Sequence, residues 1–310
     1  MTDTGQPGGS GGGREGQGAG RAASLVAWAL GPCPAIRLES FRWTLTFALL
    51  VYTIAWSFEA TEWLSAVGYH VSPEASRGLQ LPVPLLPRAA VPVFLTVYLG
   101  SMVAILFGVR PRLFAWVVLF GLLYVTTADR LAAFSMNKLA LVSWLVLVLA
   151  PWGPDPQPQP TPKSADATEP PAQLRSAWPL RILQTTLILQ YLGAGICKLR
   201  GDWLDSGQVL WLQAQDVYMT DLSAWMVREV PVGVWAALQH GALGFELAAP
   251  LLFGVRRLRP LGFGLGLAMH LGIGLMMYRV GFFSLSVVAY YVLFADERRL
   301  LAVRSRLREP

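Results

Sequence analysis

The chain has 310 residues, of which 54% are hydrophobic and 14% are charged, and its mean hydropathy is +0.46. An average soluble domain is about 45–50% apolar and about 25% charged, so this composition excludes an ordinary soluble enzyme and a disordered chain. The class that remains is an integral membrane protein. The net charge of +6 is first considered as a topology signal, and two cysteines are too few for a disulfide scaffold.

Residues 1–40 are expected to form a Gly-rich, disordered N-terminus that ends in a short interfacial segment. Residues 8–13 read Gly-Gly-Ser-Gly-Gly-Gly, a run that buries little apolar surface and loses much backbone entropy on folding. The apolar patch 25–30 is too short to cross a bilayer and predicts a segment lying at its surface. No cleavable signal peptide is recognised, because the first strong apolar stretch lies too far into the chain.

Residues 41–297 are expected to form an all-α, polytopic membrane bundle of about eight transmembrane helices. A membrane-spanning helix needs about 20 mostly apolar residues, and eight segments approach this requirement. The candidate segments are 44–64, 89–109, 113–129, 136–152, 178–198, 233–254, 261–278 and 280–295.

Two long connections interrupt these segments. Residues 153–176 form a Pro-rich polar linker, and residues 199–232 form an acidic loop whose Trp and Tyr side chains suit a membrane–water interface. Eight spans place both termini on one side, and most of the 25 basic residues then fall on that side, including those of the tail 298–310. The positive-inside rule therefore predicts cytoplasmic termini and an outer loop 199–232. Topology accounts for the positive charge, so no nucleic acid partner is expected.

One pentapeptide, Leu-Phe-Gly-Val-Arg, occurs twice, at 106–110 and at 252–256. Because the two copies end the second and the sixth predicted span, they suggest a tandem repeat of two four-helix halves. The alternative is that cytoplasmic turns converge on Gly and Arg independently. The sequence leaves both interpretations open.

Polar side chains inside predicted spans are costly and therefore mark candidate functional positions. Glu246 lies near the middle of the sixth span, with Gln239 seven residues earlier on the same helix face. The alternative for Glu246 is a structural carboxyl that is protonated or paired. His270 stands between Gly266 and Gly274 at four-residue spacing, in a stripe without side chains. Such a stripe indicates either close helix packing or the wall of a cavity for a flat ligand.

More polar residues lie at the outer ends of the spans. Lys198 ends the fifth span and shares a helix face with Tyr191; a desolvated lysine can act as a base, whereas a lysine at a helix end can simply extend to the interface. Arg279 ends the seventh span, as an interfacial anchor or as part of a pocket. Asn137 and Lys138 begin the fourth span at the same level. The three histidines lack the spacing of a metal site, so no metal is expected.

Three motifs, in order along the chain, resemble signatures of the HTTM family, the membrane domain shared by vitamin K-dependent gamma-glutamyl carboxylases and many bacterial proteins. The first is residues 190–199, Gln-Tyr-Leu-Gly-Ala-Gly-Ile-Cys-Lys-Leu, followed by Trp203. The second runs from Glu-Leu at 246–247 to Arg-Pro-Leu-Gly at 259–262. The third runs from Met-His-Leu at 269–271 to Val-Gly-Phe-Phe at 280–283. The resemblance implies eight helices arranged as four pairs.

In the carboxylases of this family, a reduced quinone is deprotonated by a membrane lysine, reacts with oxygen and becomes the base that removes a glutamate proton. The resemblance places Lys198 on that lysine and His270 on a family histidine near the quinone. It implies an outward-facing pocket that binds a reduced quinone or a lipid. The residues expected to line or support this pocket are Tyr191, Gln239, Glu246, Arg279, Asn137, Lys138 and Trp203.

Two departures from the carboxylases leave the activity open. Lys138 stands where the carboxylases have a histidine after an asparagine, and the chain stops at Pro310 without their large lumenal domain. The expectation is therefore a bacterial inner-membrane protein with a quinone or lipid pocket, with or without carboxylase-like chemistry. The alternative is a non-enzymatic accessory factor in the export or maturation of a secreted partner peptide, which would contact loop 199–232. A transporter ranks last, because the polar groups gather near one face.

Overall fold

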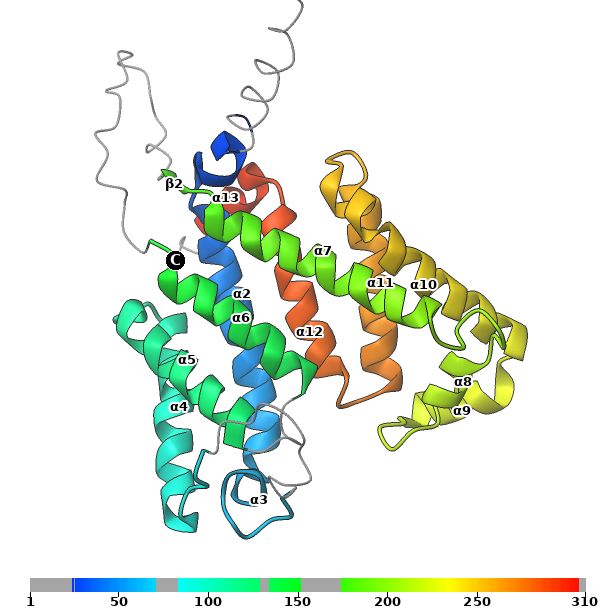
Figure 1. Ribbon diagram of the computed structural model, residues 1–310, viewed down its shortest axis with the longest axis horizontal. Coiled ribbons are helices and arrows are strands. Elements are labelled where there is room, and N and C mark those ends of the chain that lie inside the picture. The colour runs from blue at the N-terminus through cyan, green and yellow to red at the C-terminus, as the bar shows by residue number, and fades with distance from the viewer. Residues whose placement is uncertain (1–23, 25, 71–82, 129–133, 152–173, 307–310) are drawn as a thin grey trace, which may run out of the picture.

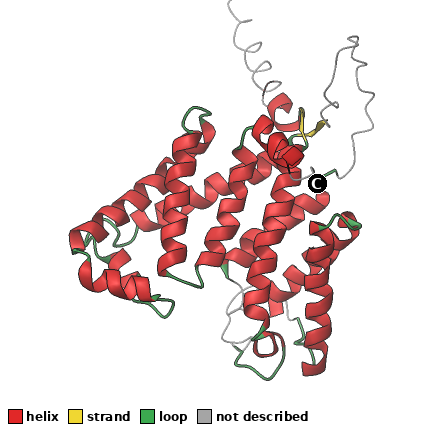
Figure 2. Cartoon of the chain, turned by 180° about the vertical axis from the view of Figure 1, so that it is seen from behind, coloured by secondary structure: helices red, strands yellow, loops and turns green. Residues whose placement is uncertain are grey.

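The computed structural model describes residues 24, 26–70, 83–128, 134–151 and 174–306, and almost all of its ordered elements are helices (Figure 1, Figure 2). The predicted all-α class is confirmed. Two three-residue strands, β1 (Pro32–Pro34) and β2 (Leu174–Ser176), form an antiparallel pair in which Cys33 faces Arg175. The Gly-rich run near the N-terminus, most of the Pro-rich linker and the end of the C-terminal tail lie outside the described residues.

Each of the eight segments predicted from the sequence is overlapped by a helix of the described chain. These helices are α2 (Ile36–Ser57), α4 (Val91–Leu106), α5 (Pro111–Ala128), α6 (Ser135–Leu149), α7 (Trp178–Leu199), α10 (Val232–Gly254), α11 (Arg259–Met276) and α12 (Gly281–Ala289), which continues as the 3-10 helix η2 (Tyr290–Phe294). Shorter helices occupy the connections and the tail: α3 (Ala60–Leu64), η1 (Arg88–Ala90), α8 (Val209–Gln213), α9 (Asp221–Glu229) and α13 (Glu297–Arg306).

Three helical segments of the described chain are long and apolar enough to cross a membrane, namely Arg88–Leu106, Pro111–Ala128 and Trp178–Leu199. Two further segments, Ser135–Leu149 and Gly281–Phe294, are apolar but shorter. The positions of the helices thus match the predicted segments. That all eight of them cross the membrane stays a prediction.

Local sequence signals explain where several helices begin and end. Pro111 and Pro179 lie in the first turns of α5 and α7, where the missing N–H group is not needed. Gly108, in the turn between α4 and α5, has a φ of 74°, in the left-handed region that glycine adopts most easily. The first predicted segment, 44–64, is divided, because α2 ends at Ser57 and α3 follows only after Glu59.

The helices pack as a continuous bundle around one large apolar core. Helix α7 lies along α10, α11 lies between α10 and α12, and α2 contacts α4, α12 and η2 (Figure 1). A second, smaller cluster of Ala214, Trp235 and Met276 joins the 200–231 connection to α10 and α11. This connection is therefore a packed part of the fold.

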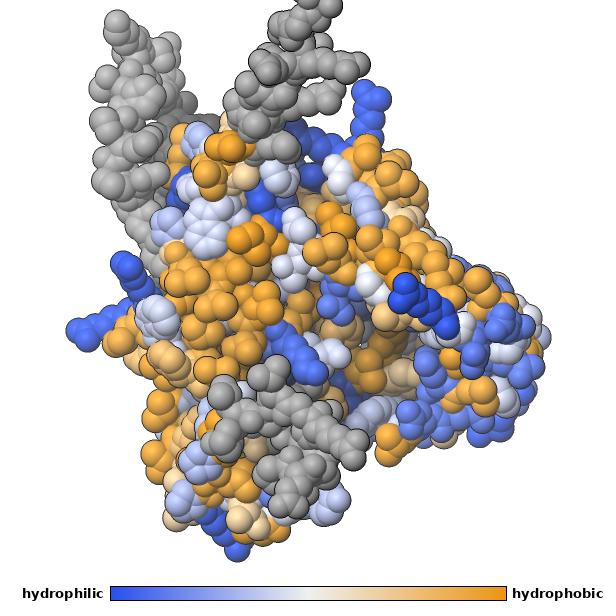
Figure 3. Space-filling model, in the orientation of Figure 1, coloured by the Kyte–Doolittle hydropathy of each residue, from blue (hydrophilic) through white to orange (hydrophobic). Residues whose placement is uncertain are grey.

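Large apolar side chains also cover much of the outer surface of the bundle (Figure 3). Exposed examples on five helices are Val93, Phe120, Leu189, Leu251 and Leu271, with exposed fractions between 59% and 65%. Apolar surface on this scale is unusual for a soluble monomer and is typical of helices that face lipid.

Candidate functional site

An ion pair joins α7 to α10 near the end of α7. The Lys198 ammonium group donates a hydrogen bond to Oε1 of Glu246, which is 6% exposed. The other carboxylate oxygen of Glu246 is buried and has no hydrogen-bond partner among the described residues. The helices approach closely here because Gly195 has no side chain; a Cβ atom at this position would lie 3.2 Å from Cβ of Glu246. Lys198 is therefore held by a buried carboxylate and does not simply extend to solvent.

Trp203 and Gln239 complete the surroundings of this ion pair. The Lys198 Nζ atom lies 4.9 Å from the centroid of the Trp203 ring, a cation–π contact. The Gln239 amide donates to the backbone oxygen of Trp203 at 2.6 Å and accepts from the backbone nitrogen of Leu210 at 3.0 Å. Gln239 thus satisfies backbone groups of the 200–210 loop and holds Trp203 beside the lysine.

A second polar network surrounds Tyr191 and His270. Tyr191 lies about two helical turns before Lys198 on α7. The Tyr191 hydroxyl lies 2.7 Å from Nε2 of His270 and 2.7 Å from the Tyr291 hydroxyl. The Nδ1 atom of His270 lies 3.1 Å from the Ser284 hydroxyl. Both imidazole nitrogens therefore have partners, and the four buried side chains form one hydrogen-bonded chain from η2 through α7 and α11 to α12.

The glycine stripe on α11 packs against neighbouring helices. A Cβ atom at Gly266 would lie 1.9 Å from the Tyr291 hydroxyl oxygen, and one at Gly262 would lie 3.1 Å from Cβ of Leu252. One at Gly274 would lie 3.6 Å from Cα of Gly281. Of the two interpretations of the stripe, these contacts favour close helix packing.

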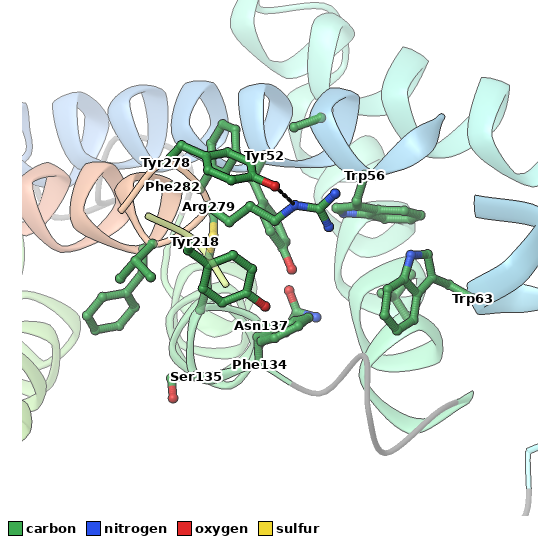
Figure 4. Close-up of a pocket in the computed structure, with 15 residues that line it drawn as sticks. Tyr52, Trp56, Trp63, Phe134, Ser135, Asn137, Tyr218, Tyr278, Arg279 and Phe282 are labelled. Atoms are coloured by element: carbon green, nitrogen blue, oxygen red, sulfur yellow. Dashed lines mark hydrogen bonds between the residues drawn. The ribbon is translucent and has the colours of Figure 1, made fainter. Parts of the chain in front are cut away.

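A cavity of about 420 Å³, which none of the four residues of this network lines, lies between α2, α6, the start of α12 and the turn after α11 (Figure 4). Its wall is largely aromatic, and its polar groups come from Asn137, Arg279 and tyrosine hydroxyls. The lining residues are Tyr52, Ala55, Trp56, Trp63, Val125, Phe134, Ser135, Met136, Asn137, Tyr218, Tyr278, Arg279, Val280, Phe282 and Phe283. A site of this size, with a few polar groups among apolar walls, suits a small amphipathic molecule.

Arg279, which lines the cavity, has two side-chain partners. Its guanidinium group pairs with Glu59 at 3.0 Å, and its Nε–H group donates to the Tyr278 hydroxyl at 3.2 Å (Figure 4). Tyr278 in turn contacts the ring of Tyr218, which ties the 200–231 connection to the cavity rim.

The structure thus divides the residues selected from the sequence into three places. Lys198, Trp203, Gln239 and Glu246 form the ion-pair cluster; Tyr191 and His270 form the buried network; and Asn137 and Arg279 line the cavity. Lys138 is exposed and is not among the lining residues.

Sequence reasoning missed the aromatic wall of the cavity and two members of the buried network, Tyr291 and Ser284. Most of the residues expected to line the pocket belong to the fifth to seventh predicted spans, whereas α2, α6 and the start of α12 supply most of the lining. Tyrosines near helix ends resemble ordinary interfacial anchors, so no sequence signal distinguished them. No group of three or more potential metal ligands occurs among the described residues.

Comparison with known families gives one match. The model of the HTTM domain family matches residues 45–298, which include all three polar clusters. No curated protein and no solved structure matches the chain. The matched region covers most of the 310 residues, and the order of the motifs around Lys198, Glu246 and His270 is that of the family resemblance. The chain therefore belongs to the HTTM domain family.

Proposed function

We propose that this protein crosses the membrane eight times and binds a quinone-like molecule or a lipid in the cavity between α2, α6 and α12. The observation that carries this proposal is the aromatic cavity of about 420 Å³ with Asn137 and Arg279 in its wall. An aromatic wall suits a flat ring system, and an amide and a guanidinium group can donate hydrogen bonds to its oxygens.

The proposed orientation places the cavity on the outer face of a bacterial inner membrane, with both termini in the cytoplasm. Arginines gather where β1, β2 and α13 meet, at the opposite end of α2 from the cavity. Basic residues concentrate on the cytoplasmic side of membrane proteins, which supports this orientation. The cavity then opens toward the outside and the bilayer, from which an apolar ligand can enter.

A reduced quinone, when bound, would supply the oxygen-dependent base of carboxylase-like chemistry. For this chain, the proposed role of Lys198 is that of a proton acceptor in the ion-pair cluster, which is separate from the residues that line the cavity. To accept a proton, Lys198 would first pass its own extra proton to Glu246, the carboxylate that it contacts. The proposed role of His270 is to orient Tyr191, with its ring fixed by Ser284.

Filling the cavity is expected to weaken ligand binding. Ala55 lines the cavity, so Ala55→Phe should raise the dissociation constant for 2-methyl-1,4-naphthoquinone about tenfold or more, measured by equilibrium dialysis of the full chain in detergent. The matched control is Ala89→Phe, at an exposed alanine that is not among the lining residues, and it should bind as the wild type does. Equal binding by all three proteins would refute the cavity as the site.

Replacing Lys198 tests the chemistry separately from binding. With reduced naphthoquinone, Lys198→Ala should consume oxygen at least tenfold more slowly than the wild type, as general-base contributions to rate are about 10²–10⁴-fold. Lys138→Ala, at an exposed lysine outside the cluster, is the control. If the wild type binds naphthoquinone but both variants match its oxygen uptake, the ligand proposal stands and the base assignment is wrong.

The second candidate is a non-enzymatic accessory factor for a secreted partner peptide. The supporting observation is the set of exposed apolar side chains on the 200–231 connection, such as Val217 (78%) and Trp225 (52%). Association with a peptide that is lost on replacement of these two residues but kept in Lys198→Ala would favour this function over the enzymatic one.

A further inference from the structure

Arginines and exposed apolar side chains gather at the end of the bundle farthest from the cavity. We define this basic end as residues 26–42, 174–181, 255–259 and 295–306. Its arginines greatly outnumber its carboxylates, which are Glu39, Asp296 and Glu297. The arginines are Arg37, Arg42, Arg175, Arg181, Arg256, Arg257, Arg259, Arg298, Arg299, Arg304 and Arg306.

Direct contacts show that the terminal segments of the basic end form one surface. Helix α13 is joined to α2 by two ion pairs, Arg37 with Glu297 at 3.1 Å and Arg304 with Glu39 at 2.7 Å. Glu39 also pairs with Arg175 of β2 at 3.0 Å.

The turn between α10 and α11 belongs to the same surface. Arg259 donates to the backbone oxygen of Phe294, just before α13, at 3.4 Å. Arg256, in the same turn, lies within electrostatic range of Arg181 at the start of α7. The helical residues 26–30 lie here as well, because the Arg181 guanidinium carbon is 4.8 Å from the Trp28 ring.

The three carboxylates of the basic end are already engaged. Glu39 and Glu297 hold the ion pairs described above, and Asp296 accepts the backbone N–H groups of Arg298 and Arg299 at the start of α13. Five exposed arginines have no ion-pair partner among the described residues: Arg256, Arg257, Arg298, Arg299 and Arg306. The surface thus carries positive charge that no carboxylate of the described residues neutralises.

Apolar side chains are interleaved with these arginines. Trp28 and Leu30 are 53% and 56% exposed, and Leu301 and Val303 on α13 are 50% and 55% exposed. Hydrophilic and hydrophobic residues lie next to one another in the part of this end that is visible at the top of Figure 3. A short helix that exposes both arginines and apolar residues is suited to lie in the plane of a membrane interface, with its apolar side chains among the lipids.

We infer that the basic end is a binding surface for the headgroups of anionic phospholipids. The phosphates would pair with the five exposed arginines, while Trp28, Leu301 and Val303 enter the interface beside the acyl chains. A bilayer is the partner that this surface fits, because positive charge alone would suit many anions, whereas exposed apolar groups in the same surface require an apolar phase next to the phosphates. The inference does not depend on the ligand of the cavity.

The inference predicts charge-dependent retention of lipid. Detergent-solubilised full chain is titrated with dioleoyl-phosphatidylglycerol or dioleoyl-phosphatidylcholine, and bound lipid is counted by native mass spectrometry. The wild type should bind phosphatidylglycerol at least tenfold more tightly than phosphatidylcholine, and 0.5 M salt should remove most of the preference. The triple variant Arg256→Gln, Arg298→Gln, Arg299→Gln should lose about tenfold or more in phosphatidylglycerol affinity.

Two further triple variants test whether the loss of affinity comes from the lost charge rather than from misfolding, and whether it depends on where the charge is removed. The same triple with lysine in place of glutamine keeps the charge and should retain the lipid. A triple at the opposite end, Arg88→Gln, Arg200→Gln, Arg228→Gln, removes three other exposed charges and should bind as the wild type does. Equal affinity of the wild type for the two lipids, an unchanged affinity in the basic-end triple, or an equal loss in the opposite-end triple would each overturn the inference.

Discussion

Lys198→Met is expected to lower the free energy of unfolding by about 3–5 kcal/mol, the range found when one partner of a buried ion pair is removed. The side chain of Glu246 is only 8% exposed, so its carboxylate would remain in the bundle without a counter-charge. The second carboxylate oxygen already has no hydrogen-bond partner among the described residues, and loss of Lys198 would leave the first oxygen in the same state. Unfolding of the detergent-solubilised chain, followed by circular dichroism, measures the effect.

A double-mutant cycle separates the ion pair from side-chain packing. Glu246→Leu alone leaves a lysine that is 24% exposed and can reach solvent, so we expect a smaller loss than for Lys198→Met. The double variant should recover most of the stability, because an apolar pair of similar volume often replaces a buried ion pair without loss. If Lys198→Met is as stable as the wild type, or the two changes are simply additive, the ion pair does not contribute in this way.

Gly266→Ala is the second change with a large expected effect. The new methyl group would lie 1.9 Å from the Tyr291 hydroxyl oxygen and 2.9 Å from Cζ of Phe245, so at least one of these rings must move. Overpacking of this kind costs about 1–3 kcal/mol of stability. Displacement of Tyr291 would also break its hydrogen bond to Tyr191, the same hydroxyl that meets His270. Thermal unfolding measures the loss of stability.

Gly264→Ala, on the same helix, is the matched control for this prediction. A Cβ atom at Gly264 would have no neighbour within 4 Å. It should be as stable as the wild type or slightly more stable, since alanine favours helices over glycine. Removing the clashing oxygen should restore part of the stability, so Gly266→Ala combined with Tyr291→Phe should be more stable than Gly266→Ala alone. Equal effects of Gly266→Ala and Gly264→Ala would contradict the close packing of α11 against η2.

Hydropathy was sufficient to predict the eight helices that overlap the predicted spans, but not the shorter helices α8, α9 and α13. A helix overlaps each predicted segment because long apolar runs, bounded by Pro, Gly and charged residues, satisfy their backbone hydrogen bonds internally. The largest difference is at 44–64, where the polar Glu59 lies between two helices and pairs with Arg279. That partner is 220 residues away in the chain, so no local pattern around Glu59 could indicate it.

Helical spacing also predicted which residues share a face, but it did not predict their partners. Tyr191 and Lys198 lie on one side of α7, as the seven-residue spacing indicates, yet they meet different residues. Lys198 reaches Glu246 on α10, whereas Tyr191 reaches His270 on α11 and Tyr291 on η2. The periodicity of one helix carries no information about the angle and depth at which another helix packs against it.

The sequence by itself thus determined the all-α class, the approximate helix bounds, the family, and the pairs of residues that share a helix face. Only the tertiary structure decided that the selected polar residues form three separate clusters, and that the cavity lies among Tyr52, Asn137 and Arg279 rather than beside Lys198. The physical reason is that a cavity forms where the ends of several helices diverge. Its position therefore depends on the packing of the whole bundle, whereas a helix depends mainly on its own residues.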